Sequence, residues 1–304
     1  MKAKKAIIGI AASVCVALML TSCGTDGTSS DPSASPASAS GFDTSKAITV
    51  VSREDGSGTR GAFIELMGVE EKDASGNKKD MTTKEAIIAS KTDVMLTNIA
   101  NDPYAIGYVS LGSLNDTVKA LDVDGAAATA DNIKNGTYKV SRPFNIATKG
   151  EPTGVAKDFI NFIMSKEGQE VVAGDYIKVD ENAESFTSDN STGKIVVGGS
   201  SSVSPLMEEL KEAYLGINPG AEIEIQTNDS TAGMTGTIDG NFDIGMASRE
   251  MKDSEKAELT GTQIALDGIA IIVNPENTID GLTSDQIKGI YTGATTTWSG
   301  VASN

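Results

Sequence analysis

Short apolar runs alternate with segments of helical spacing along the chain from residue 45 onward. Runs rich in β-branched residues predict strands, and apolar residues three or four positions apart predict helices. The predicted strands span 48–51, 94–97, 106–109, 195–197, 222–226, 244–246 and 264–273. The predicted helices span 59–67, 83–90, 155–165, 205–215, 232–239 and 284–291. This alternation favours an α/β fold with largely parallel sheets.

The first 44 residues follow a different pattern. Three lysines precede an apolar run at residues 6–20, which is typical of a targeting segment and short for a membrane span. The sequence LTSC at residues 20–23 resembles the bacterial lipobox, which implies a signal peptide at residues 1–22 and lipid attachment at Cys23. An ordinary secretory signal with an incidental cysteine is the alternative. Residues 23–44 are rich in Ser, Ala, Pro and Gly and predict a flexible linker to a domain on the extracytoplasmic face of the cell membrane.

Length and charge narrow the class of protein. The chain has 304 residues and a formal net charge of −17, and its length suits two domains of ordinary size or one large one. The acidic balance argues against binding to nucleic acid and against a basic surface for anionic lipid. It does not exclude a small anion, because salt screens distant surface charges within about 10 Å.

The residue types that the sequence lacks also matter. There is no histidine, and both cysteines, Cys15 and Cys23, lie in the first 23 residues. The remaining chain therefore has no Ser-His or Cys-His pair, no histidine zinc ligand and no disulfide framework. A hydrolase that uses one of the clustered serines would also need a base, and none of those serines begins a Ser-x-x-Lys pattern. We expect binding rather than catalysis, with neither metal nor cofactor.

The turn after the strand at 48–51 has the composition of an anion site. It contains Arg53, Ser57, Gly58 and Thr59 and leads into a predicted helix. Glycines let backbone N–H groups approach a ligand, and a helix N-terminus adds free donors and partial positive charge. Hydroxyls donate to oxyanions, and a guanidinium can bind two of their oxygens. Taken alone, a glycine-rich connecting turn explains this segment about as well.

Two further strand-to-helix turns have similar composition. The sequence GGSSSVSP at 198–205 follows a strand, and capping of the next helix would need only one serine, Ser204. Another polar turn, TNDSTAG at 227–233, precedes a helix, after which the strand at 244–246 leads to Ser248 and Arg249. Ligands in open α/β sheets bind beyond the carboxyl ends of strands, where such turns gather. Three such turns together predict an oxyanion site.

Five segments carry a resemblance to a known family: SREDGSGTRGAF, DPYAIGYVSLGSL, GGSSSVSPL, DIGMASREMK and ALDGIAIIVNP. From Ala47 to the C-terminus the chain resembles the phosphate-binding lipoproteins (PstS type) of bacterial phosphate ABC importers. The resemblance implies a two-lobed, periplasmic-binding-protein-like clamp (type II-like). It also implies capture of inorganic phosphate between the lobes and delivery to an ABC permease. A monomer is sufficient for that role.

The order of these segments departs from the usual family layout. The serine-rich segment normally opens the mature protein and DGSGT follows in the second half, whereas here DGSGT comes first. The chain therefore resembles a circular permutant, with residues 179–193 joining the former ends. We expect one continuous lobe at 141–273 and a discontinuous lobe that combines 45–140 with 274–304.

The resemblance implies specific roles for site residues. Its phosphate contacts fall on Arg53, Ser57, Gly58 and Thr59 in the first turn, with Asp55 orienting Arg53. The other contacts fall on Ser201, Ser202, Ser230 and Ser248; of these, Ser230 is indicated by the resemblance alone.

Two positions leave alternatives open. Some family members have an aspartate at the place of Ser248, where it accepts a hydrogen bond from protonated phosphate and repels sulfate. A serine both donates and accepts, so a receptor for sulfate, molybdate or arsenate is an alternative, as is a surface sensor or adhesin on the same fold. Arg249 either adds a second positive contact or forms a salt bridge.

Overall fold

The structure, a computed structural model, describes residues 41–73 and 76–301. The predicted signal peptide and the lipidation site at Cys23 lie outside these residues. None of the helices in the described ranges is long and apolar enough to cross a membrane. The strands are β1 (Thr49–Arg53), β2 (Glu70–Lys72), β3 (Lys78–Asp80), β4 (Ile87–Ala89), β5 (Ala105–Ser110), β6 (Lys119–Val123), β7 (Ser141–Thr148), β8 (Ile177–Lys178), β9 (Gly193–Ser200), β10 (Ala221–Asn228), β11 (Ile244–Ala247), β12 (Thr260–Val273) and β13 (Gly281–Leu282).

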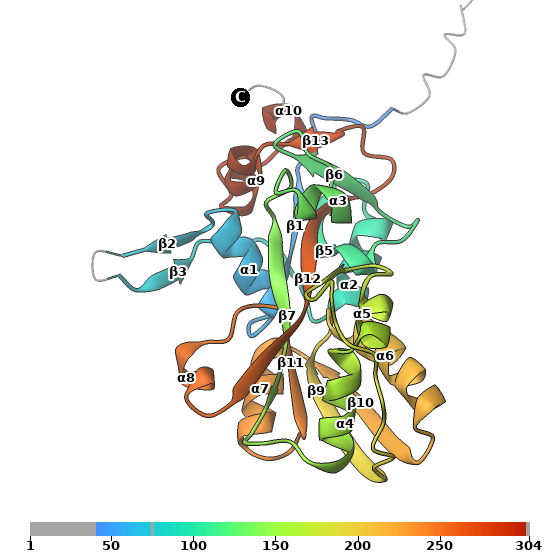
Figure 1. Ribbon diagram of the computed structural model, residues 1–304. Helices are drawn as coiled ribbons and strands as arrows, with labels where there is room; N and C mark the ends of the chain where they lie inside the picture. The colour runs from blue at the N-terminus through green and yellow to red at the C-terminus, as the bar shows by residue number, and fades with distance from the viewer. Residues whose placement is uncertain (1–40, 74–75, 302–304) are drawn as a thin grey trace, which may run out of the picture. The chain divides into compact units, whose positions relative to one another are not determined.

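Helices accompany the strands through the chain, so the predicted α/β class is confirmed (Figure 1). The helices are α1 (Gly58–Leu66), α2 (Thr92–Asn101), α3 (Ala130–Lys134), α4 (Gly154–Ile163), α5 (Lys166–Val172), α6 (Ser204–Ile217), α7 (Ser230–Ile238), α8 (Asp253–Lys256), α9 (Ser284–Tyr291) and α10 (Trp298–Val301), with a 3-10 turn η1 (Leu111–Ser113).

The main sheet is mixed, and the expectation of largely parallel sheets is wrong. Its strand order is β10-β9-β11-β7-β12-β5-β1-β4, with β6, β8 and β13 attached beside this path. β9 pairs in parallel with β10 and β11, and β1 pairs in parallel with β4 and β5. The strands between these two groups, β7 and β12, pair antiparallel with all their neighbours. The apolar pattern did not identify β7, so the direction of the central strands could not be inferred.

The apolar side chains pack into two separate cores. The first, called the β1 core, gathers side chains of β1, β5, β6, α1, α2, α9 and α10. The second, called the β9 core, gathers side chains of β9, β10, β11, α4, α5, α6 and α7. β12 contributes to both: Ile264 and Ala265 lie in the β9 core, and Ile269 and Ile271 lie in the β1 core. β12 therefore belongs to both cores, and the assignment of one lobe to 141–273 and of the other to 45–140 with 274–304 stays a prediction.

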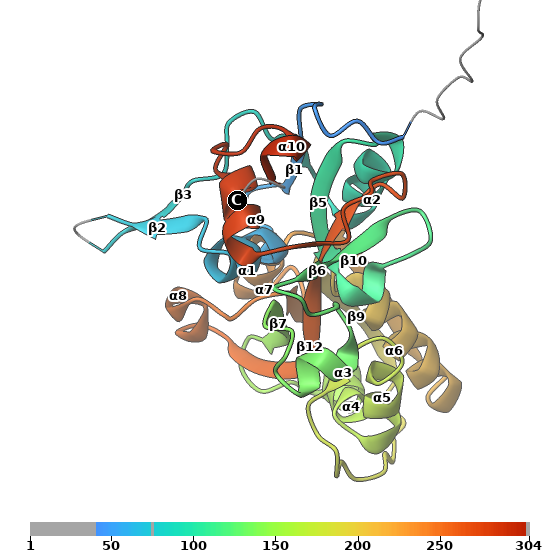
Figure 2. The ribbon, with the colours of Figure 1, turned by 90° about the horizontal axis from the view of Figure 1, so that it is seen from above.

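Within each core, alternate residues of one strand face opposite helical layers. In β11, Met246 packs with α4, α5 and α6, whereas Ala247 packs with α7. In β1, Val50 packs with α1 and α9, whereas Val51 packs with α2. Figures 1 and 2 show β7 and β12 running from the part that contains β1 and β5 into the part that contains β9 and β11. Helices on both faces leave the strand ends and their turns free to form a site.

Two predicted elements are wrong. The segment 94–97 is not a strand, because it lies inside α2, where Thr92, Met95 and Ile99 share the buried face. The segment 83–90 is not a helix; it contains β4, which adds to the edge of the sheet beside β1. The isoleucines at 87 and 88 are 48% and 52% exposed, so their apolar character does not report a buried helix face.

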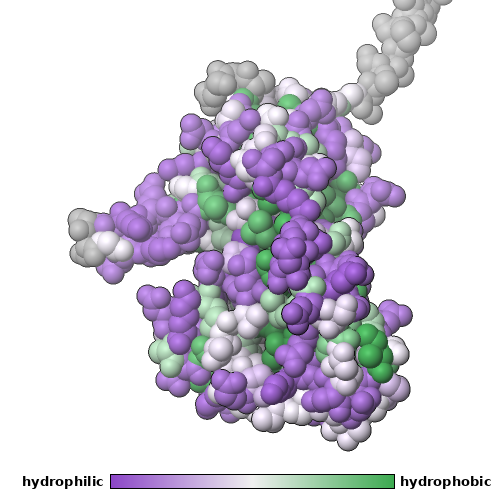
Figure 3. Space-filling view, viewed as in Figure 1, coloured by the Kyte–Doolittle hydropathy of each residue, from purple (hydrophilic) through white to green (hydrophobic). Residues whose placement is uncertain are grey.

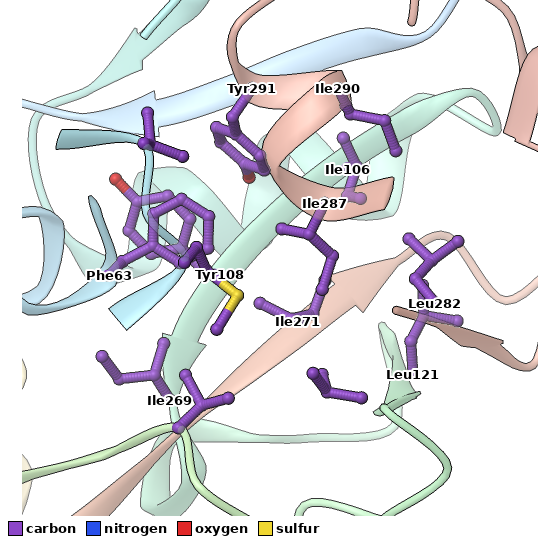
Figure 4. Close-up of a cluster of buried hydrophobic side chains, with 14 of the residues drawn as sticks. Phe63, Ile106, Tyr108, Leu121, Ile269, Ile271, Leu282, Ile287, Ile290 and Tyr291 are labelled. Atoms are coloured by element: carbon purple, nitrogen blue, oxygen red, sulfur yellow. The ribbon is translucent and has the colours of Figure 1, made fainter. Parts of the chain in front are cut away.

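Aromatic packing fixes α1, and with it the turn that leads into α1. The ring of Phe63 stacks on that of Tyr108 with centroids 4.0 Å apart, and Tyr291 of α9 packs edge-on against Phe63 (Figure 4). The Tyr108 hydroxyl lies 2.9 Å from Ser52 Oγ and accepts a hydrogen bond from the Arg53 N–H. The first predicted anion turn is therefore attached directly to the β1 core.

Replacing Phe63 with alanine should lower the free energy of unfolding by about 3–5 kcal/mol, because it removes a fully buried ring and leaves a cavity. Leu66→Ala in the same helix is a matched control, since Leu66 is 41% exposed. It should cost only about 0.5 kcal/mol. Urea unfolding followed by circular dichroism measures both; equal losses would show that α1 is not anchored through Phe63.

Candidate anion-binding site

The structure brings the three predicted turns together. The first leads from β1 into α1, the second from β9 into α6, and the third from β10 into α7, with Ser248 directly after β11. The guanidinium Nη2 of Arg53 donates to Ser201 Oγ at 2.9 Å. Thr59 Oγ1 and Ser202 Oγ lie 2.8 Å apart, within hydrogen-bond distance. Both contacts join a turn of the β1 core to a turn of the β9 core.

Gly58 permits the closest approach between the two sides. A Cβ atom on Gly58 would overlap Ser230 Oγ and lie 2.7 Å from Ser248 Oγ, so any side chain there would have to displace these hydroxyls. Ser230 Oγ accepts a hydrogen bond from the Ser248 N–H at 3.1 Å. Ser200 donates to Ser248 Oγ at 2.9 Å. The first residue of α1 is thus held against the hydroxyl of Ser230 in the third turn and that of Ser248, directly after β11.

Nearly all of these groups are buried. Arg53 is 2% exposed and Thr59 is 1% exposed, and the other hydroxyl-bearing residues of the cluster, namely Ser57, Ser200, Ser201, Ser202, Ser230 and Ser248, are also buried. Hydroxyls and backbone N–H groups donate hydrogen bonds, and a guanidinium adds positive charge. In the described residues no group of His, Cys, Asp and Glu side chains could hold a metal ion. This set of donors suits a tetrahedral oxyanion.

The carboxylate that orients Arg53 is not the expected one. Glu54 binds the Arg53 guanidinium through both oxygens, at 2.8 Å from Nε and 2.8 Å from Nη2. Asp55 instead pairs with Arg60 Nη1 at 2.8 Å, and its side chain is 99% exposed. The prediction that Asp55 orients Arg53 is therefore wrong. Of the two acidic residues, only Glu54 lies alongside the guanidinium, because Asp55 is at the exposed outer bend of the turn.

The first and third turns also meet outside the hydroxyl cluster. The carbonyl of Gly56 accepts hydrogen bonds from the Thr231 N–H and from Thr231 Oγ1, both at 3.2 Å. Gly56 has a φ of 88°, and a Cβ there would lie 2.5 Å from Asp229 Oδ1, so only glycine fits. A cavity of about 210 Å³ beside this contact is lined by residues from both sides, among them Ser57 and Lys252. Figure 3 shows the surface hollowed between the β2–β3 hairpin and the α8 segment.

Ser57 is the N-cap of its helix, whereas Ser204 is not. Ser57 is the N-cap of α1, where its Oγ accepts from the Arg60 N–H at 3.3 Å. Ser204, expected to cap α6, is instead its first residue, and its Oγ donates to the Ser200 carbonyl at 3.1 Å. The chain turns helical earlier than expected, because the serine run 200–202 itself forms the tight turn that leads into the helix.

Arg249 forms the salt bridge that was one of its two expected roles. Its guanidinium binds both oxygens of Glu255, at 2.8 and 2.7 Å. Burial favours a raised pKa for Glu255, but hydrogen bonds from Arg249 and from the Lys252 N–H lower this pKa below its usual value. The pair lies beside the cluster, with Arg249 Nη2 3.4 Å from Thr231 Oγ1. A direct contact of Arg249 with a bound anion stays a prediction.

Comparison with known proteins identifies the family. A family model described as a PBP superfamily domain matches residues 38–167 and 184–304. The phosphate-binding protein PstS 2 of Streptococcus agalactiae is 52% identical over 255 residues, which cover 83% of this chain and 87% of that protein. The chain belongs to the PstS family. The protein of the same name from Streptococcus pneumoniae is 45% identical to this PstS-family chain over 253 residues, 83% of this chain and 86% of the relative.

A solved structure agrees with this family assignment. The crystal structure of a phosphate-binding protein of a phosphate ABC transporter from Streptococcus pneumoniae matches with a TM-score of 0.67 and 43% identity. The match covers 84% of this PstS-family chain and 100% of the solved one. The periplasmic-binding-protein-like fold is therefore confirmed. The circular permutation concerns the segment order of other family members and stays a prediction.

A buried ion pair behind Ser248 escaped the sequence analysis of this PstS-family protein. Arg142 of β7 binds Asp267 of β12 at 2.9 Å, and its Nη1 donates to the Ser248 carbonyl at 3.0 Å. Asp267 also accepts from Ser110 Oγ and from the Leu111 N–H. Burial raises the pKa of Asp267 to about 6, against the effect of Arg142, so the carboxylate is still charged at neutral pH. The pair connects β5, the two central strands and Ser248.

Arg142→Met should lower the free energy of unfolding by about 3–5 kcal/mol, because Asp267, left without its partner, must either bury an unpaired charge or take up a proton. The double variant Arg142→Met/Asp267→Leu should recover part of this loss, since it removes both charges. Urea unfolding at pH 7 measures the series. A double variant less stable than Arg142→Met would contradict the assignment of the loss to an unpaired carboxylate.

Proposed function

We propose that this protein captures inorganic phosphate between the β1 and β9 cores and delivers it to an ABC-type permease. The observation that carries the proposal is the meeting of the first turn with the serine turns of the β9 core, in a chain of the PstS family. The family relatives are named phosphate-binding proteins, and the solved relative is described as part of a phosphate ABC transporter.

The proposed binding mode follows from the donors on each side. From the β1 core, Arg53 would bind two phosphate oxygens, while Thr59 and the N-terminus of α1 at Gly58 would bind the others. From the β9 core, Ser201, Ser202, Ser230 and Ser248 would add hydroxyl donors. Ser57, in the first turn, would also contact the phosphate. Because only the closed arrangement brings both sets together, phosphate would stabilise closure.

The proposed role is capture and not catalysis, and the family relatives are named for binding. The proposal includes an extracytoplasmic location, with the protein acting as a monomer anchored by lipid on Cys23. A permease would then recognise the closed protein. The proposal requires no metal or cofactor, since hydroxyls, N–H groups and one guanidinium suffice for an oxyanion.

Isothermal titration of the ligand-stripped domain with phosphate should show saturable binding in a one-to-one ratio. Arg53→Ala should weaken binding at least a hundredfold, or about 2.7 kcal/mol, because it removes a charged and bidentate donor. Lys46→Ala is a control that removes an exposed cation. Absence of heat from the folded, stripped domain would contradict phosphate capture.

Selectivity between oxyanions should depend on Ser248. Its oxygen accepts a hydrogen bond from Ser200, so its own proton is free to donate to an anion that carries no proton. Ser248→Asp would place an acceptor-only carboxylate in the cluster, which repels anions that carry no proton. We expect the ratio of phosphate to sulfate affinity to rise at least tenfold.

Ser254→Asp is the matched control for this selectivity test. It adds the same charge at an exposed position of α8. Competition titrations at pH 7 with both anions measure the ratio for each variant. An unchanged ratio in Ser248→Asp would show that Ser248 does not face the bound anion.

A further inference from the structure

Thr92 lies among the anion-site residues, although neither the sequence pattern nor the family resemblance assigns it a role. Its Oγ1 is 3.3 Å from Ser201 Oγ, 3.4 Å from Ser202 Oγ and 3.4 Å from Arg53 Nη1. These three partners come from both sides of the site. Thr92 is 4% exposed, so its hydroxyl is directed inward.

The position of Thr92 on α2 explains this inward direction. Thr92, Met95 and Ile99 share the buried face of the helix, at the spacing of an amphipathic pattern. Met95 and Ile99 pack in the β1 core, but Thr92 is polar and stands at the end of the same stripe. A polar side chain at this place is costly unless it has hydrogen-bond partners. Its partners are the groups expected to bind the anion.

The geometry favours a direct contact with the bound anion. Thr92 Oγ1 accepts from Arg53 Nη1, so its one proton is left to Ser201 or Ser202, and all three distances are longer than the 2.8–2.9 Å contacts of Arg53 with Ser201 and of Thr59 with Ser202. Thr92 is therefore the loosely bound member of the cluster and can reorient at little cost. An anion bound by Arg53, Ser201 and Ser202 would have an oxygen within reach of this hydroxyl.

We infer that Thr92 is a further phosphate-binding residue, whose hydroxyl donates to a phosphate oxygen beside Arg53. This inference rests on the proposed function. It adds the start of α2 to the three turns and the segment after β11 that build the site. The N-cap residue of α2, Lys91, makes no side-chain capping bond, so the first turn of the helix is not covered by its own cap.

Titration of the ligand-stripped domain with inorganic phosphate tests the inference. Thr92→Val keeps the shape but removes the hydroxyl and should weaken phosphate binding about tenfold. Thr92→Ser should restore binding to within about threefold of the parent. Thr97→Val is the matched control, since Thr97 is exposed on the same helix and its hydroxyl donates to the Asp93 carbonyl, away from the site. It should bind phosphate as the parent does.

A second comparison separates ligand contact from positioning of Arg53. Thr92→Val is introduced into Arg53→Lys, whose shorter cation cannot make the Arg53 contacts. A further fall in affinity of about tenfold supports direct contact. No further fall would mean that Thr92 acts only through Arg53 and would overturn the inference, as would parent-like binding by Thr92→Val.

The same titrations keep the two proposals distinguishable. If the parent binds phosphate, Arg53→Ala does not and Thr92→Val matches the parent, the inference about Thr92 fails while phosphate capture stands. If the folded parent itself binds no phosphate, the proposed function fails and the inference fails with it.

Discussion

The buried charge of Arg53 constrains the site more than any other single feature. A guanidinium that is 2% exposed is stable only with partners for its donors, since a buried and unpaired charge is costly. Glu54 supplies one such partner from the same turn. The others, Ser201 and Thr92, come from segments 148 and 39 residues away in the chain. The Arg53 guanidinium therefore has all of these hydrogen-bond partners only when the β9 core lies against the first turn.

Two long strands join the two cores within one sheet. β7 and β12 pair with each other and pass from one core to the other, so the cores are joined through the sheet and not only through side chains. The Arg142–Asp267 pair lies on these strands and reaches both Ser110 of β5 and the Ser248 carbonyl. In the proposed opening and closure, this hydrogen-bonded connection would keep the two sets of hydroxyls in the same register. Movement would then be concentrated where the cores touch, at Gly58 and at the Gly56–Thr231 contact.

The sequence predicted the parts of the site that are local in the chain. A strand, a turn with arginine, glycines and hydroxyls, and a helix follow one another within 20 residues, as predicted, with Arg53 at the end of β1 and Ser57, Gly58 and Thr59 at the start of α1. Their role as phosphate ligands stays a prediction. The residues missed depend on pairings across the fold. Glu54 and Asp55 are equivalent by composition, and only the bend of the turn selects Glu54. Thr92 is missed because the apolar run 94–97 predicts a strand. The spacing of Thr92, Met95 and Ile99, which fits one face of a helix, could have indicated it. Arg142 and Asp267 are 125 residues apart, and nothing local marks either of them.

The same arrangement explains how a chain of net charge −17 can host an anion. Glu54 balances the charge of Arg53, so the cluster is not a strong positive centre even before the acidic surface is considered. Attraction for an anion must therefore come mainly from short-range dipoles: hydroxyls, backbone N–H groups and the N-termini of α1 and α7. Such dipoles act over a few ångströms in a buried site, where solvent and salt screen little. They also demand a ligand whose oxygens point in several directions at once, because the donors come from opposite sides. A tetrahedral oxyanion meets that demand, and a planar carboxylate, which has oxygens on one side only, does not.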